Sequence, residues 1–177
     1  RLGYEGFGWR LWIYDFVLPR GRPAHYRLGG KRYSVMTDMT GDVRVAYVSC
    51  NGREHGDARR ENAERNALWQ RLRDQHEEAP FSLILHGGDQ IYADEMSDAH
   101  PLLAKWASNW PGGRRHLGFN PDMREAAERW LLDTYLRLAS APAVAYLNAR
   151  VPSLMMWDDH DIMDGWGSLR PWRLESS

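Results

Sequence analysis

Three short apolar segments, each followed directly by polar residues, constrain the fold of this chain more than any other feature of its sequence. Val43–Val48 precedes Ser49-Cys50-Asn51, Phe81–Leu85 precedes His86-Gly87-Gly88-Asp89, and Ser153–Trp157 precedes Asp158-Asp159-His160-Asp161. Short apolar runs bounded by turn residues are typical of buried strands. We therefore expect three strands whose carboxyl ends all carry functional groups.

Helical sequence separates these strands. Residues 57–78 carry alanine and leucine at helical spacing, and residues 101–150 are mostly helical, most clearly over Met123–Leu138. The order strand, helix, strand, helix, strand predicts an α/β fold with a mainly parallel sheet and helical cover.

The first forty residues have a different pattern. Trp9–Val17 alternates aromatic and β-branched residues, and residues 26–36 favour one or two further strands around Gly29-Gly30. We predict that residues 1–40 are the end of a β-rich N-terminal module and that residues 41–177 form a separate domain.

Composition excludes several classes of protein. Hydrophobic residues make up 43% and charged residues 27% of the chain, as in globular proteins, and the apolar runs are too short to cross a bilayer. With 23 basic and 24 acidic side chains, the net charge of -1 provides no global positive field for a phosphate backbone. We expect neither nucleic acid nor membrane as a partner. A single cysteine, Cys50, excludes an internal disulfide and a cysteine-based zinc ribbon.

The polar residues after the strands form the candidate site. Carboxyl ends of parallel strands meet at one edge of a sheet, so we expect these side chains to share one crevice. Two carboxylates about 6 Å apart at an effective dielectric of about 20 repel by roughly 3 kcal/mol, which predicts a multivalent cation, or two, among them. Oxygen ligands suit Ca²⁺, Mg²⁺, Mn²⁺ or Fe³⁺, whereas a thiolate from Cys50 favours a transition metal.

Each candidate also has a structural interpretation. Cys50 could be a small buried hydrophobe, Tyr92 a core or rim aromatic and His86 a satisfied strand-end histidine, and an aspartate run is commonly a solvated loop. A P-loop, a G-x-S-x-G elbow and an H-E-x-x-H helix are all absent from the sequence, which leaves nucleophilic serine catalysis without support.

Three blocks closely resemble the alkaline phosphatase D (PhoD-like) family of calcineurin-like metallophosphoesterases. They are Val-Ser-Cys-Asn at 48–51, Leu-His-Gly-Gly-Asp-Gln-Ile-Tyr-Ala-Asp at 85–94 and Trp-Asp-Asp-His-Asp-Ile-Met-Asp-Gly-Trp-Gly-Ser at 157–168. The resemblance covers about residues 43–168. It implies that residues 41–177 are the N-terminal half of an αββα sandwich.

The resemblance also implies roles for individual residues. His160 matches the histidine that donates a proton to the leaving alkoxide, and Asp89 takes part in catalysis as a central metal ligand. The implied metals are iron, with Cys50 and Tyr92 as ligands, and calcium. The implied metal ligands together are Cys50, Asp89, Tyr92 and Asp94, with Asp159 or Asp164 from the third block.

The function implied is hydrolysis of phosphate monoesters or diesters by a metal-activated hydroxide, with a phosphate ester as the substrate. One alternative is a non-catalytic metal-binding or interaction domain, and another is a metallohydrolase acting on other substrates. Retention of His160 favours catalysis, because a structural cation needs no proton donor. The family completes its site with ligands from a C-terminal half. We therefore expect this chain to be truncated, inactive by itself and prone to self-association through an unpaired sheet face.

Overall fold

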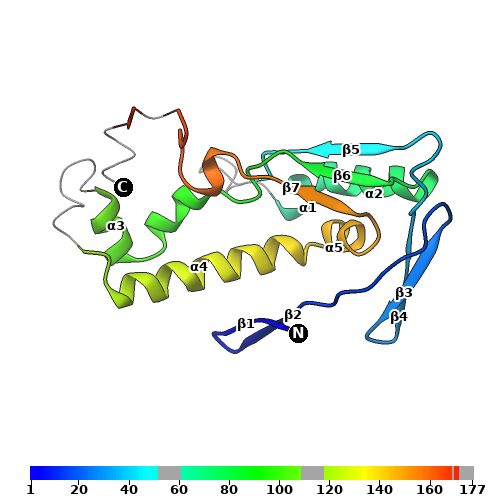
Figure 1. Cartoon of the computed structure of the whole chain (residues 1–177). Coiled ribbons are helices and arrows are strands. Elements are labelled where there is room, and N and C mark those ends of the chain that lie inside the picture. The colour runs from blue at the N-terminus through cyan, green and yellow to red at the C-terminus, as the bar shows by residue number, and fades with distance from the viewer. Residues whose placement is uncertain (52–60, 109–117, 169, 172–177) are drawn as a thin grey trace.

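The computed structural model describes residues 1–51, 61–108, 118–168 and 170–171 of the 177-residue chain. Its central element is a parallel sheet with the order β5-β6-β7, formed by β5 (Val45–Val48), β6 (Leu83–His86) and β7 (Ser153–Met155) (Figure 1). The prediction of a parallel sheet from three apolar segments is confirmed. The fold is mixed α/β.

Helices connect the strands. They are α1 (Asn62–Arg65), α2 (Ala67–Glu78), α3 (Pro101–Ser108), α4 (Pro121–Ala139) and α5 (Pro142–Asn148), with the 3₁₀ helices η2 (Ala93–Asp98) and η4 (Asp159–Asp161). The helix predicted over residues 57–78 is divided at Asn66, and residues 57–60 lie outside the described part. Asparagine favours a helix start over a helix interior because its side chain competes for backbone hydrogen bonds. None of the described helices has the length and apolar character needed to cross a membrane.

The main core lies between the sheet and the helices α2 and α5. Ile84 of β6 and Leu147 of α5 are completely buried, and Ala46 of β5 and Trp69 of α2 belong to the same cluster. Ile84 faces this core because side chains alternate along a strand. Packing against this face therefore buries β6, the middle strand of the sheet.

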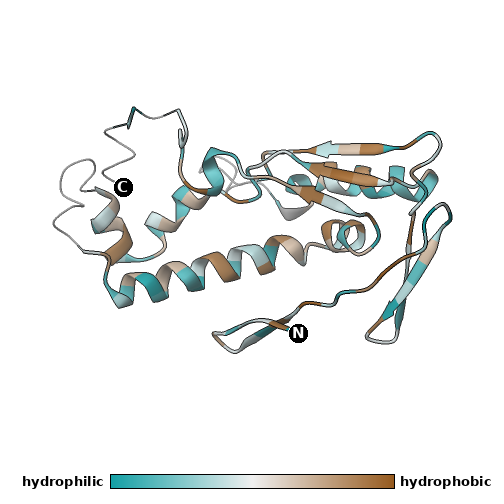
Figure 2. Cartoon of the chain, viewed as in Figure 1, coloured by the Kyte–Doolittle hydropathy of each residue, from teal (hydrophilic) through white to brown (hydrophobic). Residues whose placement is uncertain are grey.

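The opposite face of the sheet is apolar and open. Val45, Tyr47 and Leu154 remain 46%, 68% and 63% exposed. Figure 2 shows brown, hydrophobic stretches in each of the three strands. Parallel sheets are normally covered on both faces, so this face is a surface on which further structure can pack.

Two hairpins precede the sheet. β1 (Leu2–Gly6) pairs with β2 (Trp9–Trp12), and β3 (Ala24–Leu28) pairs with β4 (Lys31–Val35) through Gly29-Gly30, whose φ angles of 56° and 76° suit a tight hairpin turn. The strand predicted over Trp9–Val17 is wrong beyond Trp12: Ile13 still exchanges backbone hydrogen bonds with Arg1, but residues 13–17 are not part of a strand.

The second hairpin contacts the end of α5. The Tyr26 hydroxyl donates a hydrogen bond of 2.6 Å to the carbonyl of Ala149, and the Arg150 guanidinium lies 5.3 Å from the centre of the Tyr33 ring. Tyr26 and Tyr33 stack on each other with 5.0 Å between ring centres. The β-rich segment is therefore attached to the helices that cover the sheet.

Candidate functional site

Cys50, which follows β5, and Asp89, which follows β6, both adopt left-handed backbone conformations. Their φ angles are 55° and 54°, an uncommon choice for residues other than glycine that is often found at functional sites. Backbone hydrogen bonds join the loop after β5 (the β5 loop, residues 49–51) to the loop after β6 (the β6 loop, residues 87–92), from the N–H of Cys50 to Gly88 and from the N–H of Asn51 to Asp89. The Cys50 side chain also lies against the Asp89 carboxylate, where it partly offsets the rise in the pKa of that carboxyl that burial causes. Cys50 itself is exposed, so its interpretation as a buried hydrophobe is wrong.

Asp89 is the buried acid of the site. It is only 4% exposed, and burial raises the pKa of its carboxyl, while the Cys50 side chain and the hydrogen bond from the backbone of His160 act in the opposite direction. The N–H of His160 donates 3.2 Å to the carboxylate of Asp89. Asp89 therefore contacts both the β5 loop and the loop after β7 (the β7 loop, residues 156–168).

His160 is held by two side chains that follow β6. Its Nδ1 lies 2.6 Å from a carboxylate oxygen of Asp94, and its ring stacks on Tyr92 with 4.2 Å between centres and 21° between planes. A carboxylate only accepts hydrogen bonds, so Nδ1 carries a proton and Nε2 is the nitrogen left for other chemistry. Burial opposes protonation of His160, but Asp94, with Asp159 and Asp89, outweighs burial and raises the pKa of the imidazole.

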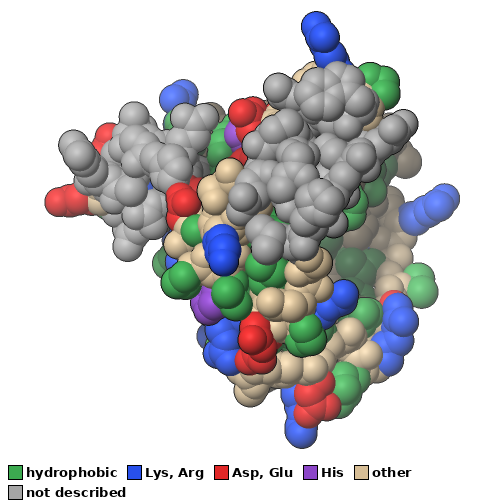
Figure 3. Space-filling model, turned by 90° about the vertical axis from the view of Figure 1, so that its left-hand side faces the viewer, with side chains coloured by type: hydrophobic (Ala, Val, Ile, Leu, Met, Phe, Trp, Pro, Cys, Tyr) green, Lys and Arg blue, Asp and Glu red, His purple; other side chains and the backbone are tan. Residues whose placement is uncertain are grey.

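The acids form two overlapping groups that could hold a cation. Ligand atoms of Asp89, Asp158 and Asp159 lie within 4.8 Å of one another, as do those of Asp159, His160 and Asp164. Asp159 belongs to both groups, and the N–H of Gly165 donates 2.7 Å to its carboxylate, which lowers its pKa. Acidic side chains lie beside a histidine on the face shown in Figure 3. Carboxylate oxygens with one imidazole fit a divalent or trivalent cation.

The structure thus brings six of the predicted residues into one site, namely Cys50, Asp89, Tyr92, Asp94, Asp159 and His160. Asp164 is exposed but stands 4.0 Å from Nε2 of His160. The two carboxylate oxygens of Asp94 accept hydrogen bonds from His160 and from the N–H of Asp164. Neither of the two acidic groups described above includes Cys50 or Asp94.

The sequence placed Asp158 and Asp161 after the third strand but gave neither an individual role in this site. Asp158 joins Asp89 in one of the possible metal-holding groups. Asp161 bonds the backbone of Asp158 and of the β6 loop instead of joining either group. The spacing Asp158-x-x-Asp161, which is that of a capping box at a helix start, is the sequence signal that could have identified Asp161 as a backbone acceptor.

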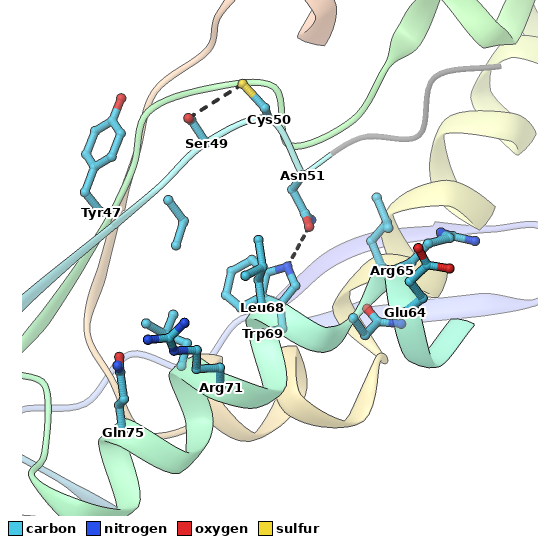
Figure 4. Close-up of a pocket in the computed structure, with 14 residues that line it drawn as sticks. Tyr47, Ser49, Cys50, Asn51, Glu64, Arg65, Leu68, Trp69, Arg71 and Gln75 are labelled. Carbon is cyan, nitrogen blue, oxygen red and sulfur yellow. Dashed lines mark hydrogen bonds between the residues drawn. The ribbon is translucent and has the colours of Figure 1, made fainter. Parts of the chain in front are cut away.

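A pocket of about 710 Å³ lies on the α2 side of the β5 loop (Figure 4). Ser49, Cys50 and Asn51 line one end of it, and Leu68, Trp69 and Arg71 are among the residues lining the helical side. The indole N–H of Trp69 donates 2.6 Å to the side-chain oxygen of Asn51. This bond ties the loop that carries Cys50 to the packed helix α2.

His86 belongs to the core rather than to the acidic site. It is 7% exposed, its ring centre lies 6.2 Å from that of Trp69, and burial lowers its pKa. Within the described part of the chain its Nε2 has no hydrogen-bond partner. His86 is therefore a buried strand-end histidine, although among the described residues its Nε2 is not satisfied as that interpretation expected.

The fold and site define an α/β protein with an acid and histidine centre at the carboxyl edge of a parallel sheet. A family model described as PhoD related phosphatase matches residues 25–177, which contain every candidate residue. The chain belongs to the PhoD related phosphatase family.

One curated relative is the "Uncharacterized protein YGR266W" of Saccharomyces cerevisiae, which is 27% identical over 159 residues. The match covers 81% of this chain and 22% of the relative, so the chain spans less than a quarter of that protein. No solved structure matches this chain.

Proposed function

We propose that the full-length protein hydrolyses phosphate monoesters or diesters in a metal-dependent reaction at this site. The observation that carries the proposal is His160, held 2.6 Å from Asp94 and stacked on Tyr92 beside acids that could hold a cation. Membership of a phosphatase-related family supports a phosphoric ester as the substrate.

The metal would be held chiefly by Asp89, Asp158 and Asp159, with Asp164 next to them. A bound cation supplies charge stabilisation for the phosphoryl oxygens and activates water for attack. Cys50 and Tyr92, which lie against Asp89 and His160, are proposed as further ligands of an iron-type site. Calcium is the proposed second metal.

His160 is proposed to donate the proton that the leaving oxygen requires. Asp94 fixes Nδ1, so the ring presents Nε2 toward the side of Asp164. The pKa of His160 is raised chiefly by the Asp94 hydrogen bond and charge acting against burial, which increases the protonated fraction near neutral pH. A general acid is most effective when its pKa lies near the working pH.

The open sheet face supports a further part of the proposal. Val45, Tyr47 and Leu154 present apolar side chains where the second sheet of a calcineurin-like αββα sandwich would pack. We propose that residues 41–177 are one half of that sandwich, that the 177-residue chain alone is inactive, and that it associates with copies of itself through this face. The same face supports the alternative function, a non-catalytic interaction domain.

The test uses the full-length protein with an aryl phosphate and an aryl phosphodiester, with and without chelator. Hydrolysis that is lost with chelator and restored by metal is expected. Asp89→Asn should lose metal and activity together, since one carboxylate would serve both. His160→Ala should retain metal and lose about 10²-fold to 10⁴-fold in rate. The exposed Asp42→Asn is the matched control and should behave as the wild type.

Substrates with different leaving groups test whether His160 is the proton donor. Loss of rate in His160→Ala should be smaller for esters whose leaving groups need little protonation. An equal loss on good and poor leaving groups would remove the proton-donor role from His160. Absence of metal-dependent hydrolysis of both substrates would contradict the proposed function and favour the interaction domain.

A further inference from the structure

We propose that Asp161 is a positioning residue, whose carboxylate sets the β6 loop against the β7 loop and so places Asp89 opposite His160. The inference rests on the proposed function for its catalytic consequence. Its structural part stands on hydrogen bonds within the chain.

The carboxylate of Asp161 accepts hydrogen bonds from three consecutive backbone N–H groups of the β6 loop. Asp89 donates to Oδ2 at 2.7 Å, Gln90 to Oδ1 at 2.9 Å and Ile91 to Oδ1 at 3.3 Å. Gly88 and Asp89 have positive φ angles of 106° and 54°, which turn these N–H groups toward one point. Successive N–H groups in such a conformation form an anion-binding concavity, and Asp161 supplies its anion.

The same carboxylate also stabilises its own loop. The N–H of Asp158 donates to Oδ2 at 3.1 Å, and the backbone of Asp161 bonds the Asp158 side chain in return, which closes a capping box around η4. Asp159 and His160 lie inside that box. One side chain therefore orders both the turn that carries His160 and the turn that carries Asp89.

These bonds distinguish Asp161 from the other acids of the segment. A carboxylate offers about four lone-pair positions, and four N–H donors already engage this one. Asp161 accordingly belongs to neither of the groups able to hold a cation, whereas Asp158 and Asp159 do. Its contribution is to the position of the ligands.

One hydrogen bond of the site depends directly on the position that Asp161 sets. The N–H of His160 reaches the Asp89 carboxylate at 3.2 Å only while the two turns stay in this register. A displacement of about 1 Å between reacting groups can cost about 10²-fold in rate. Removing the Asp161 carboxylate should therefore lower the rate without removing a ligand.

The first experiment measures amide hydrogen exchange in the full-length protein by mass spectrometry. Asp161→Asn keeps the shape of the side chain but turns one acceptor into a donor that faces N–H groups. Exchange in a peptide covering residues 88–92 should rise at least ~10-fold relative to wild type, the change expected for loss of shared acceptors. A peptide covering β6 should exchange as in wild type, as should both peptides in the control Asp42→Asn. Unchanged exchange at 88–92 would overturn the proposal.

The second experiment tests positioning by chemical rescue. Asp161→Ala empties the concavity, and added formate should restore both the protection of residues 88–92 and part of the lost turnover, while chloride at equal ionic strength should not. At saturating metal, Asp161→Asn should keep the wild-type metal content and KM while kcat falls about 10²-fold. Loss of metal at saturation, as expected for Asp89→Asn, would make Asp161 a ligand and overturn the proposal.

The two proposals fail separately. If the wild-type protein hydrolyses no phosphate ester, the proposed function fails, and exchange with formate rescue still decides whether Asp161 holds the β6 loop. If hydrolysis is found and Asp161→Asn retains both full kcat and full protection, only the positioning role is refuted.

Discussion

Replacing Gly88 by alanine tests the close approach of the two loops that form the site. Gly88 is buried and has a φ of 106°, which side chains rarely adopt. A Cβ at this position would lie 2.4 Å from Cβ and 2.6 Å from the backbone nitrogen of Asp158. Neither atom belongs to the flexible end of a side chain, so the β7 loop itself must move.

The expected destabilisation has two parts. A side chain at positive φ costs about 1–2 kcal/mol, and overpacking against a backbone that must shift costs about 1–3 kcal/mol. Gly88→Ala should therefore lower the free energy of unfolding by about 2–5 kcal/mol. Gly30→Ala is the matched control, because its φ is 76° and nothing lies within 4 Å of a Cβ there. It should show only the first part.

The assay is urea unfolding followed by circular dichroism, with both variants and the wild type measured at the same protein concentration. Metal affinity of the full-length variant should fall as well, because the displaced Asp158 belongs to the same possible metal-holding group as Asp89. Equal destabilisation of Gly88→Ala and Gly30→Ala would show that the contact with Asp158 adds nothing to the loss of folding free energy. That result would refute the argument that these loops meet at Gly88.

Three further predictions concern association and pH. Light scattering should show that the 177-residue chain self-associates and that the double substitution Tyr47→Lys and Leu154→Lys shifts it toward monomer. A monomeric wild type would contradict the proposal that the exposed sheet face drives association. Burial lowers the pKa of His76 in the folded chain, so below about pH 6.5 the unfolded chain binds a proton first and the free energy of unfolding should fall as the pH falls. His76→Gln should flatten this pH dependence of stability, and an unchanged slope would exclude His76 as the source of the dependence. Asp94→Asn should move the high-pH limb of the rate profile to lower pH, because the group that raises the pKa of His160 is lost. If the limb does not move, the titration of His160 is not its cause.

The strands, most of the helices and the family could be predicted from the sequence because each depends on local pattern. Apolar runs bounded by turn residues indicated β5, β6 and β7 whatever their neighbours, and the order of elements implied the parallel sheet that the structure has. Three sequence blocks carried the PhoD-like resemblance, and the match over residues 25–177 agrees with it.

Local pattern was less informative about the bounds of some elements. The residues after Trp12 have strand-like sequence, yet β2 ends at Trp12, and Ile13 continues the pairing through reciprocal backbone hydrogen bonds with Arg1. Asn66 interrupts a helical pattern that extends on both sides of it. In both cases the sequence pattern alone did not fix where the element ends.

Apart from the capping-box spacing of Asp158 and Asp161, the separate tasks of the acids were decided by tertiary structure. In the sequence, Asp94, Asp159 and Asp161 are equivalent carboxylates, and their crowding predicted only a cation. In the folded chain, Asp94 bonds His160 across 66 residues, and Asp161 bonds the N–H of Asp89 across 72 residues. A carboxylate takes its role from the donor it faces, and here the donors that face these acids include N–H groups from loops far away in the sequence, so only the packing of the β6 and β7 loops against each other could assign those roles.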